Sequence, residues 1–115
     1  MMSNPRNSNG AARRRLTARL RSEGRPCAVC GRPIDYSLPA GHPLSFEVDE
    51  DRPVSRWREF GYPSATACAL DWPNLAASHR CCNEWKGART LAEARSAIAA
   101  RGSRGDGPSF SRGGW

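Results

Sequence analysis

The sequence predicts a small α+β fold, and three observations carry that expectation. The chain has 115 residues, which is enough for one domain and not for two. Phe46 and Val48 alternate with polar neighbours in LSFEVDE, residues 44–50, which indicates a half-buried strand. Residues 11–22 and 90–101 are built largely from good helix formers. Helices that flank a strand without a βαβ pattern indicate the α+β class.

The first 25 residues form a basic arm, with seven Arg against one Glu. Within it, AARRRLTARLRS at 11–22 predicts a helix that places Leu16 and Leu20 four apart on one face. No apolar stretch in this segment has the length of a secretory signal. We expect the arm to be partly helical and to contact a partner through its arginines.

The middle of the chain holds two short strands and a long loop. Residues 26–43 are rich in Pro and Gly and predict loop and tight turn. After the strand at 44–50, three prolines within residues 51–73 predict a long loop with room for one short element. NLAAS, residues 74–78, predicts a second short strand.

Two helices complete the predicted domain. A helical pattern begins near Cys82 and stops at Gly87. Thr90 and Glu93 match a capping box for a further helix that ends at Arg101. The expected organisation is a basic arm at 1–25, a domain at 26–101, and a flexible tail rich in Gly and Ser at 102–115.

The cysteine pattern predicts a structural metal site. Five cysteines are an odd number, which argues against a complete set of disulfides. Only 38% of the residues are hydrophobic, and a domain with so small a core usually needs a metal or a disulfide. Cys27 and Cys30 form a C-x-x-C pair, and His79 and Cys82 repeat its spacing with one imidazole. These four ligands suit tetrahedral zinc.

Other roles for these side chains stay open. A C-x-x-C pair also occurs as a redox dithiol, although no βαβ pattern surrounds this one. Cys81 is an alternative ligand to Cys82, and Cys68 is expected to be a small buried residue. Metal-binding thiols favour a reducing compartment, so we expect a cytoplasmic protein. No stretch is apolar for long enough to cross a membrane.

The charge pattern predicts a polyanion partner. The formal net charge is +7, and Lys86 is the only lysine among 18 basic residues. Arginine pairs bidentately with phosphate, although surface charge also keeps proteins in solution. Against this background, four acids gather in five positions as Glu47, Asp49, Glu50 and Asp51. Such a cluster is either a solvated loop or a site for a cation with hard oxygen ligands.

The order of these motifs carries a resemblance. C-x-x-C is followed by VDEDRP, and then by NLAASHRCCNEWKG with the second ligand pair. This order resembles the HNH endonuclease family, in particular its small zinc-containing bacteriophage members, over residues 26–88. The resemblance implies a ββα-metal core that holds one divalent ion (Mg²⁺, Mn²⁺, Ni²⁺ or Zn²⁺) against a phosphate of DNA. For a phage protein it also implies the cytoplasm of a bacterial host and phage packaging proteins as further partners.

The resemblance assigns roles to individual residues. Asp49 and Asn83 match the ligands of the catalytic metal, Asn74 matches the central asparagine that fixes the loop and orients the base, and Lys86 matches a basic residue near phosphate. The structural zinc site falls on the four cysteine and histidine ligands above. The residues expected on DNA are Arg13, Arg14, Arg15, Arg19 and Lys86.

One position departs from the family pattern. Most members have Asp-His where this chain has Asp49-Glu50, and the missing histidine is the family's general base. Glu50 either takes over as the base or joins Asp49 as a metal ligand; His42 is a third candidate base. The departure keeps two other functions open. One is a zinc-stabilised DNA-binding module without catalysis, and the other is an interaction module of a phage packaging or replication complex.

Overall fold

A two-stranded antiparallel sheet forms the centre of the protein. The computed structural model describes residues 10–101. Strand β1 (Phe46–Glu50) pairs with β2 (Leu75–His79) over five residues, from Phe46 opposite His79 to Glu50 opposite Leu75. Both predicted strands are thereby confirmed, as is the α+β class. Among the described residues, no helix has the length and the apolar character needed to cross a membrane.

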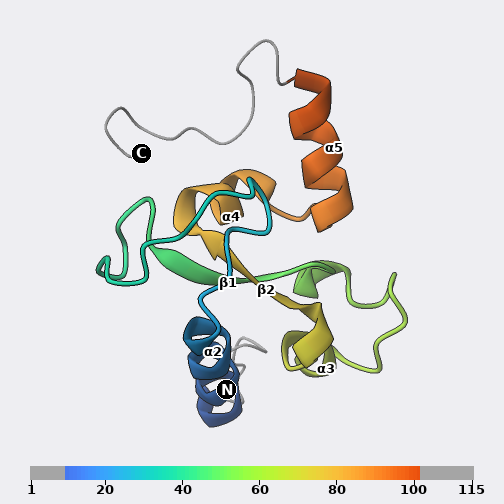
Figure 1. Ribbon diagram of the computed structural model, residues 1–115. Helices are drawn as coiled ribbons and strands as arrows, with labels where there is room; N and C mark the ends of the chain where they lie inside the picture. The colour runs from blue at the N-terminus through green and yellow to red at the C-terminus, as the bar shows by residue number, and fades with distance from the viewer. Residues whose placement is uncertain (1–9, 102–115) are drawn as a thin grey trace.

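Helices cover the sheet from two sides. In Figure 1 the sheet crosses the middle of the molecule, with α2 (Gly10–Ser22) below it and α4 (Arg80–Lys86) and α5 (Leu91–Arg101) above it. Helix α2 buries Leu20 completely and packs Leu16 against the same core, so the apolar face predicted for the arm helix is confirmed. The predicted tail at 102–115 and the first nine residues of the arm lie outside the described residues.

The segment between the strands is more structured than its prolines indicate. It contains a 3₁₀ turn η1 (Val54–Arg56), a short helix α3 (Ala65–Ala69) and a second 3₁₀ turn η2 (Trp72–Asn74), where the sequence predicted room for one element. Ser64 starts α3, because its hydroxyl accepts a hydrogen bond from the Ala67 N–H at 3.0 Å. The prolines shape short turns here instead of excluding them.

The two C-terminal helices agree with the prediction in type and differ at one boundary. Helix α4 begins at Arg80, two residues before the expected start near Cys82, because His79 takes the N-cap position directly at the end of β2. The capping box of α5 is confirmed. The Thr90 N–H donates to Glu93 Oε1 at 2.8 Å, and the Glu93 N–H donates to Thr90 Oγ1 at 3.1 Å.

Candidate metal centre and adjoining pocket

A tight turn presents the first two cysteine sulfurs. The Gly31 N–H donates to the Cys27 carbonyl and the Cys27 N–H donates to the Arg32 carbonyl, each at 2.8 Å. Gly31 has a φ of 80°, a conformation that favours glycine and lets the turn close behind Cys30. The Ala28 N–H donates to the carbonyl of Ala77 in β2 at 2.8 Å, which docks the turn on the sheet.

The second pair of ligands sits where β2 passes into α4. His79 is the last residue of the strand, and Cys82 lies in the first turn of the helix. The ligand atoms of Cys27, Cys30, His79 and Cys82 all lie within 4.8 Å of one another. Cys30 Sγ is 3.5 Å and Cys82 Sγ is 3.7 Å from His79 Nδ1. These four side chains could therefore hold a metal ion, as the spacing predicted.

The histidine ring is oriented by a backbone carbonyl. His79 Nε2 lies 3.0 Å from the carbonyl oxygen of Pro33. A proton on Nε2 makes this a hydrogen bond and leaves the lone pair of Nδ1 facing the two sulfurs. Metal-ligating histidines commonly use their second nitrogen in this way, which fixes both tautomer and ring orientation.

The three thiols of the cluster lie so close together that the pKa of each depends on the others. This dependence indicates whether the donor set suits a cation. Hydrogen bonds from the Cys30 and Cys82 thiols lower the pKa of Cys27. The same contacts with Cys27 raise the pKa of Cys30 and the pKa of Cys82, because a second thiolate beside the first is disfavoured. A bound cation removes that conflict, since it lets all three sulfurs be thiolates at once. The set is consistent with structural zinc.

The two remaining cysteines are not among the four converging ligands. Cys68 is fully buried, and its thiol lies 3.3 Å from the Arg52 carbonyl oxygen, so the expectation of a small buried residue is confirmed. Cys81 is half-buried and does not belong to the group of converging ligand atoms, which resolves the alternative between Cys81 and Cys82.

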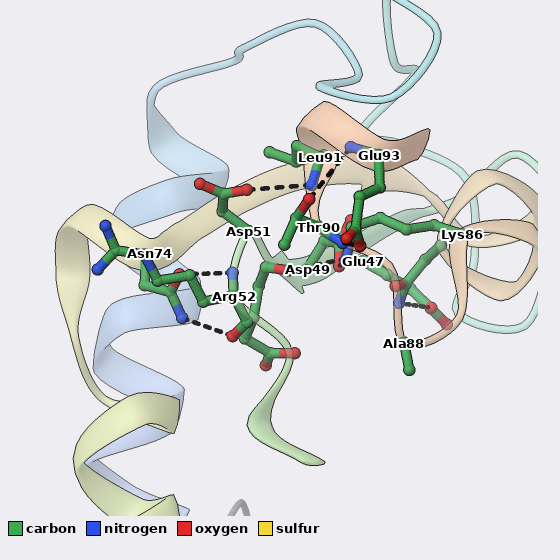
Figure 2. A network of polar contacts seen from close by, with 12 residues as sticks. Glu47, Asp49, Asp51, Arg52, Asn74, Lys86, Ala88, Thr90, Leu91 and Glu93 are labelled. Carbon is green, nitrogen blue, oxygen red and sulfur yellow. Dashed lines mark hydrogen bonds and ion pairs between the residues drawn. The ribbon is translucent and has the colours of Figure 1, made fainter. Parts of the chain in front are cut away.

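The acidic run at 47–51 is not a solvated loop. Asp49 and Glu50 are each only 2% exposed. At the start of the run, Glu47 Oε1 accepts a hydrogen bond from Asn83 Nδ2 at 3.0 Å. At its end, Asp51 Oδ1 accepts from the Leu91 N–H at 3.0 Å, at the first turn of α5 (Figure 2). Each of these two acids therefore has a specific partner on a neighbouring helix.

Asp49 forms a buried ion pair with α4. Lys86 Nζ lies 3.0 Å from Asp49 Oδ1 and donates a second hydrogen bond, of 2.8 Å, to the carbonyl of Glu50. The side chains of Lys86 and Asp49 are 1% and 2% exposed. Burial raises the pKa of Asp49 to about 6 although the ammonium lowers it, so desolvation outweighs the attraction. The other carboxylate oxygen, Oδ2, is buried without a hydrogen-bond partner.

Glu50 points to the opposite side of the sheet. Successive side chains of a strand alternate between its faces. Accordingly, Asp49 meets α4, whereas Glu50 Oε2 meets Arg13 Nη2 of α2 at 2.6 Å. The same guanidinium donates through Nη1 to the carbonyl of Ala69 at 2.5 Å. The two adjacent acids expected at one catalytic site are thus held by different helices.

Asn74 ties the ends of the long segment together. Its Oδ1 accepts a hydrogen bond from the Arg52 N–H at 2.7 Å, and its Nδ2 donates to the Arg52 carbonyl at 3.0 Å (Figure 2). Its backbone carbonyl also accepts from the Asp51 N–H at 2.9 Å. Asn74 is 4% exposed, so these bonds are shielded from water. These bonds connect the two ends of the segment, and a role of Asn74 in a catalytic site stays a prediction.

A pocket of about 470 Å³ opens beside the sheet. The residues that line it are Asp49, Glu50, Pro53, Val54, Ser55, Trp57, Ala65, Asn83, Lys86, Gly87 and Ala88. The predicted residues Asp49, Asn83 and Lys86 therefore converge on one pocket, whereas Asn74 is not among its lining residues. His42 lies elsewhere, where its Nδ1 accepts a hydrogen bond from the Leu44 N–H at 3.0 Å.

The four arm arginines that were expected on DNA divide into two groups. Arg14, Arg15 and Arg19 are exposed on α2, and the guanidinium of Arg19 lies 3.8 Å from the ring centroid of Trp72. Arg13 instead faces inward to Glu50, a role that the sequence analysis missed. The sequence contained a signal for this inward position, because Arg13 precedes Leu16 by three residues and so lies on the apolar face of the helix.

No protein-family model matches the chain, and neither a curated protein nor a solved structure matches it.

Proposed function

We propose that the protein is a metal-dependent endonuclease of the HNH type that cleaves DNA phosphodiester bonds. The observation that supports this most directly is the convergence of Asp49, Asn83 and Lys86 on one pocket beside an antiparallel strand pair and helix α4. Two further features support the proposal, namely the hydrogen bonds between Asn74 and Arg52 and the Cys₃His cluster. Both occur at the positions along the chain that the family resemblance leads one to expect.

The structural metal in this proposal is zinc. Three sulfurs and one imidazole leave no open position in a tetrahedral site, which is typical of structural and not of catalytic zinc. Such a site contributes on the order of 10 kcal/mol to folding. It would join the loop at 27–30 to the junction of β2 and α4, and so would fix the helix from which Asn83 and Lys86 project.

The catalytic metal would bind on the pocket side of Asp49. Asp49 Oδ2 is a buried acceptor without a hydrogen bond, which fits a ligand atom for a hard cation. Asn83 donates through Nδ2 to Glu47, so its amide oxygen remains for a second ligand position. When bound, a divalent ion supplies Lewis acidity at a phosphoryl oxygen. The residues around it have to hold the phosphate and receive the proton of the attacking water.

Glu50 remains the proposed base, with a condition that its contacts impose. Its carboxylate pairs with Arg13 on the α2 side of the sheet, so it has to turn from that contact toward the pocket that its residue also lines. A general base contributes about 10²–10⁴-fold to the rate. Under conditions where the variant is still folded, Glu50→Gln should therefore lower cleavage by about that factor and leave DNA binding in place. Equal cleavage by Glu50→Gln and wild type would remove Glu50 from the mechanism.

DNA binding is assigned to the exposed face of α2. Arg14, Arg15 and Arg19 project from one helix, and the stack on Trp72 limits the motion of Arg19. Replacement of one phosphate-binding arginine should flatten the slope of log affinity against log salt concentration by about 0.9 on duplex DNA. Arg13 is not expected to bind phosphate, because its guanidinium is held between Glu50 and Ala69.

A plasmid-nicking assay tests the proposal. The zinc-loaded protein is incubated with supercoiled DNA and Mg²⁺, Mn²⁺, Ni²⁺ or Zn²⁺. We expect nicking with at least one of these metals and none after Asp49→Ala. Glu84→Gln is the matched control, since it removes an exposed acid from α4 and should cleave like wild type. Absence of cleavage by wild type with every metal would refute the nuclease.

A zinc-stabilised DNA-binding module is the second candidate. It is favoured by the two buried pairs, in which Lys86 neutralises Asp49 and Arg13 neutralises Glu50. Both acids then serve the fold and neither is needed for chemistry. This candidate predicts salt-dependent DNA binding by a wild type that never cleaves. Cleavage that appears only after Glu50→His would show that the binding module retains a site able to use an imidazole base.

A further inference from the structure

We propose that Lys86 is a resident cation of the Asp49 site, which a divalent ion must displace before it can bind there. The inference rests on the proposed function only in taking Asp49 as the ligand for that ion. It adds a competition between a protein side chain and the metal. Because this competition concerns binding alone, it can be measured whether or not the protein cleaves DNA.

The position of the ammonium carries the inference. Lys86 Nζ lies 3.0 Å from Asp49 Oδ1 and 2.8 Å from the Glu50 carbonyl oxygen. Two oxygens that a hard cation would use are therefore already occupied by hydrogen bonds to a positive charge. The lysine side chain is 1% exposed, so this is a buried contact and not a surface pair that water screens.

The second carboxylate oxygen shows why the site still attracts a metal. Asp49 Oδ2 is buried and has no hydrogen-bond partner. Lys86 therefore satisfies the charge of Asp49 but only half of its acceptor capacity. A divalent ion on Oδ2 would lie close to the ammonium and be repelled by it. Tight binding then requires the ammonium to move away.

The surroundings give the ammonium a place to go. Lys86 is the last residue of α4 and is followed by Gly87, with a φ of 58°. Asp49, Lys86 and Asn83 line the same pocket of about 470 Å³. Rotation of the flexible lysine stem can move the ammonium into this space without disturbing the backbone of the helix. The displaced charge remains inside the pocket.

The exchange changes the charge of the pocket in one direction. Before it, the ammonium and the carboxylate of Asp49 cancel. Afterwards the pocket contains a divalent ion and the released ammonium as well as the same carboxylate, so its net charge is more positive by two. A positive pocket suits a phosphate group, and loading of the metal would prepare the site for a polyanion in a single step. Lys86 would thus act first as a competitor of the metal and then as a partner of the ligand.

Binding of Mn²⁺ to the zinc-loaded full chain tests the competition. Mn²⁺ prefers oxygen ligands, so it reports on Asp49 and leaves the thiolate-rich cluster to zinc. Free Mn²⁺ is followed by electron paramagnetic resonance in wild type, Lys86→Gln and Lys86→Met. The glutamine retains a donor toward Asp49 and removes the charge, and the methionine removes both. We expect Lys86→Gln to bind Mn²⁺ roughly tenfold or more tightly than wild type.

Asp49→Asn in the Lys86→Gln background is the matched control, and should abolish the gained binding. Both variants leave the buried carboxylate of Asp49 without its cation, but only Lys86→Met also removes the hydrogen-bond donor, so the methionine is the variant at greater risk of unfolding. Lys86→Gln keeps the test valid in that case. Melting temperatures give a second measurement, since Mn²⁺ should stabilise Lys86→Gln more than wild type. Equal or weaker Mn²⁺ binding by Lys86→Gln would overturn the inference. A protein that shows the gain but never cuts DNA would refute the nuclease and leave the competition standing.

Discussion

Replacement of Arg13 should separate the role of the arm in folding from its role in binding. Arg13 Nη2 and Glu50 Oε2 are 2.6 Å apart, and their side chains are 12% and 3% exposed. At that distance and an effective dielectric constant of about 20, the attraction is about 6 kcal/mol before the cost of desolvation. Removal of one partner from a buried pair typically costs about 3 to 5 kcal/mol. We therefore expect Arg13→Gln to lose about that much stability.

Thermal and denaturant unfolding of the zinc-loaded protein measure this loss. For a domain of this size, 1 kcal/mol corresponds to about 4–8 °C, so the melting temperature should fall by roughly 12 °C or more. Arg14→Gln is the matched control, because it removes an exposed arginine from the adjacent position of α2 and should change stability by less than about 0.5 kcal/mol. The salt dependence of DNA binding should show the reverse order, with a flatter slope for Arg14→Gln.

The double variant Arg13→Gln/Glu50→Gln closes the thermodynamic cycle. Two neutral amides can bond to each other and leave no buried charge, so the double variant should recover much of the stability that Arg13→Gln loses. The reasoning would be refuted if Arg13→Gln were as stable as Arg14→Gln. It would also be refuted if Arg13→Gln cost as much in the Glu50→Gln background as in wild type, because the loss would then come from packing and not from the pair.

Three further outcomes follow from contacts around the site. Cys30→Ser should lose the tightly bound metal and unfold the domain, whereas Cys68→Ser should retain the metal. Metal analysis of the purified proteins measures this difference, and equal metal content in both variants would contradict the Cys₃His assignment. Asn74→Ala should cost about 1 to 3 kcal/mol in urea unfolding, because it leaves the backbone groups of Arg52 without their buried partners; an unchanged midpoint would mean that water replaces them. Asp51→Ala should cost about 1 kcal/mol through loss of the acceptor at the start of α5, and faster amide exchange there would locate the effect.

The metal cluster and the strands were predictable because their signals are local. C-x-x-C and H-x-x-C place two ligands on one turn each, and the cluster then needs only the pairing of β1 with β2 to form. The alternation around Phe46 likewise reports on one face of one strand. In each case, the residues that carry the prediction lie within a few positions of one another along the chain.

The partners of the acids were not predictable in the same way. Asp49 and Lys86 are 37 positions apart, as are Glu50 and Arg13, and neither pair can be found without knowing which helix covers which face of the sheet. The strand pattern nevertheless indicates that the side chains of Asp49 and Glu50 lie on different faces of the sheet. Adjacent residues of a strand point to opposite faces, so a strand that continues through Glu50 separates its carboxylate from that of Asp49.

The hydrogen bonds of Asn74 affect which changes of sequence the segment between the strands can tolerate. Its side chain forms hydrogen bonds with the N–H and the carbonyl of Arg52, and so extends the hydrogen bonding of the two-stranded sheet beyond the last strand pair. The ends of the intervening segment are thereby held together independently of what lies between them. Insertion there should cost only about 0.6 kcal/mol for each doubling of length. Since this segment supplies the pocket wall at residues 53–57, it can be exchanged to alter what the pocket admits while the metal cluster stays intact.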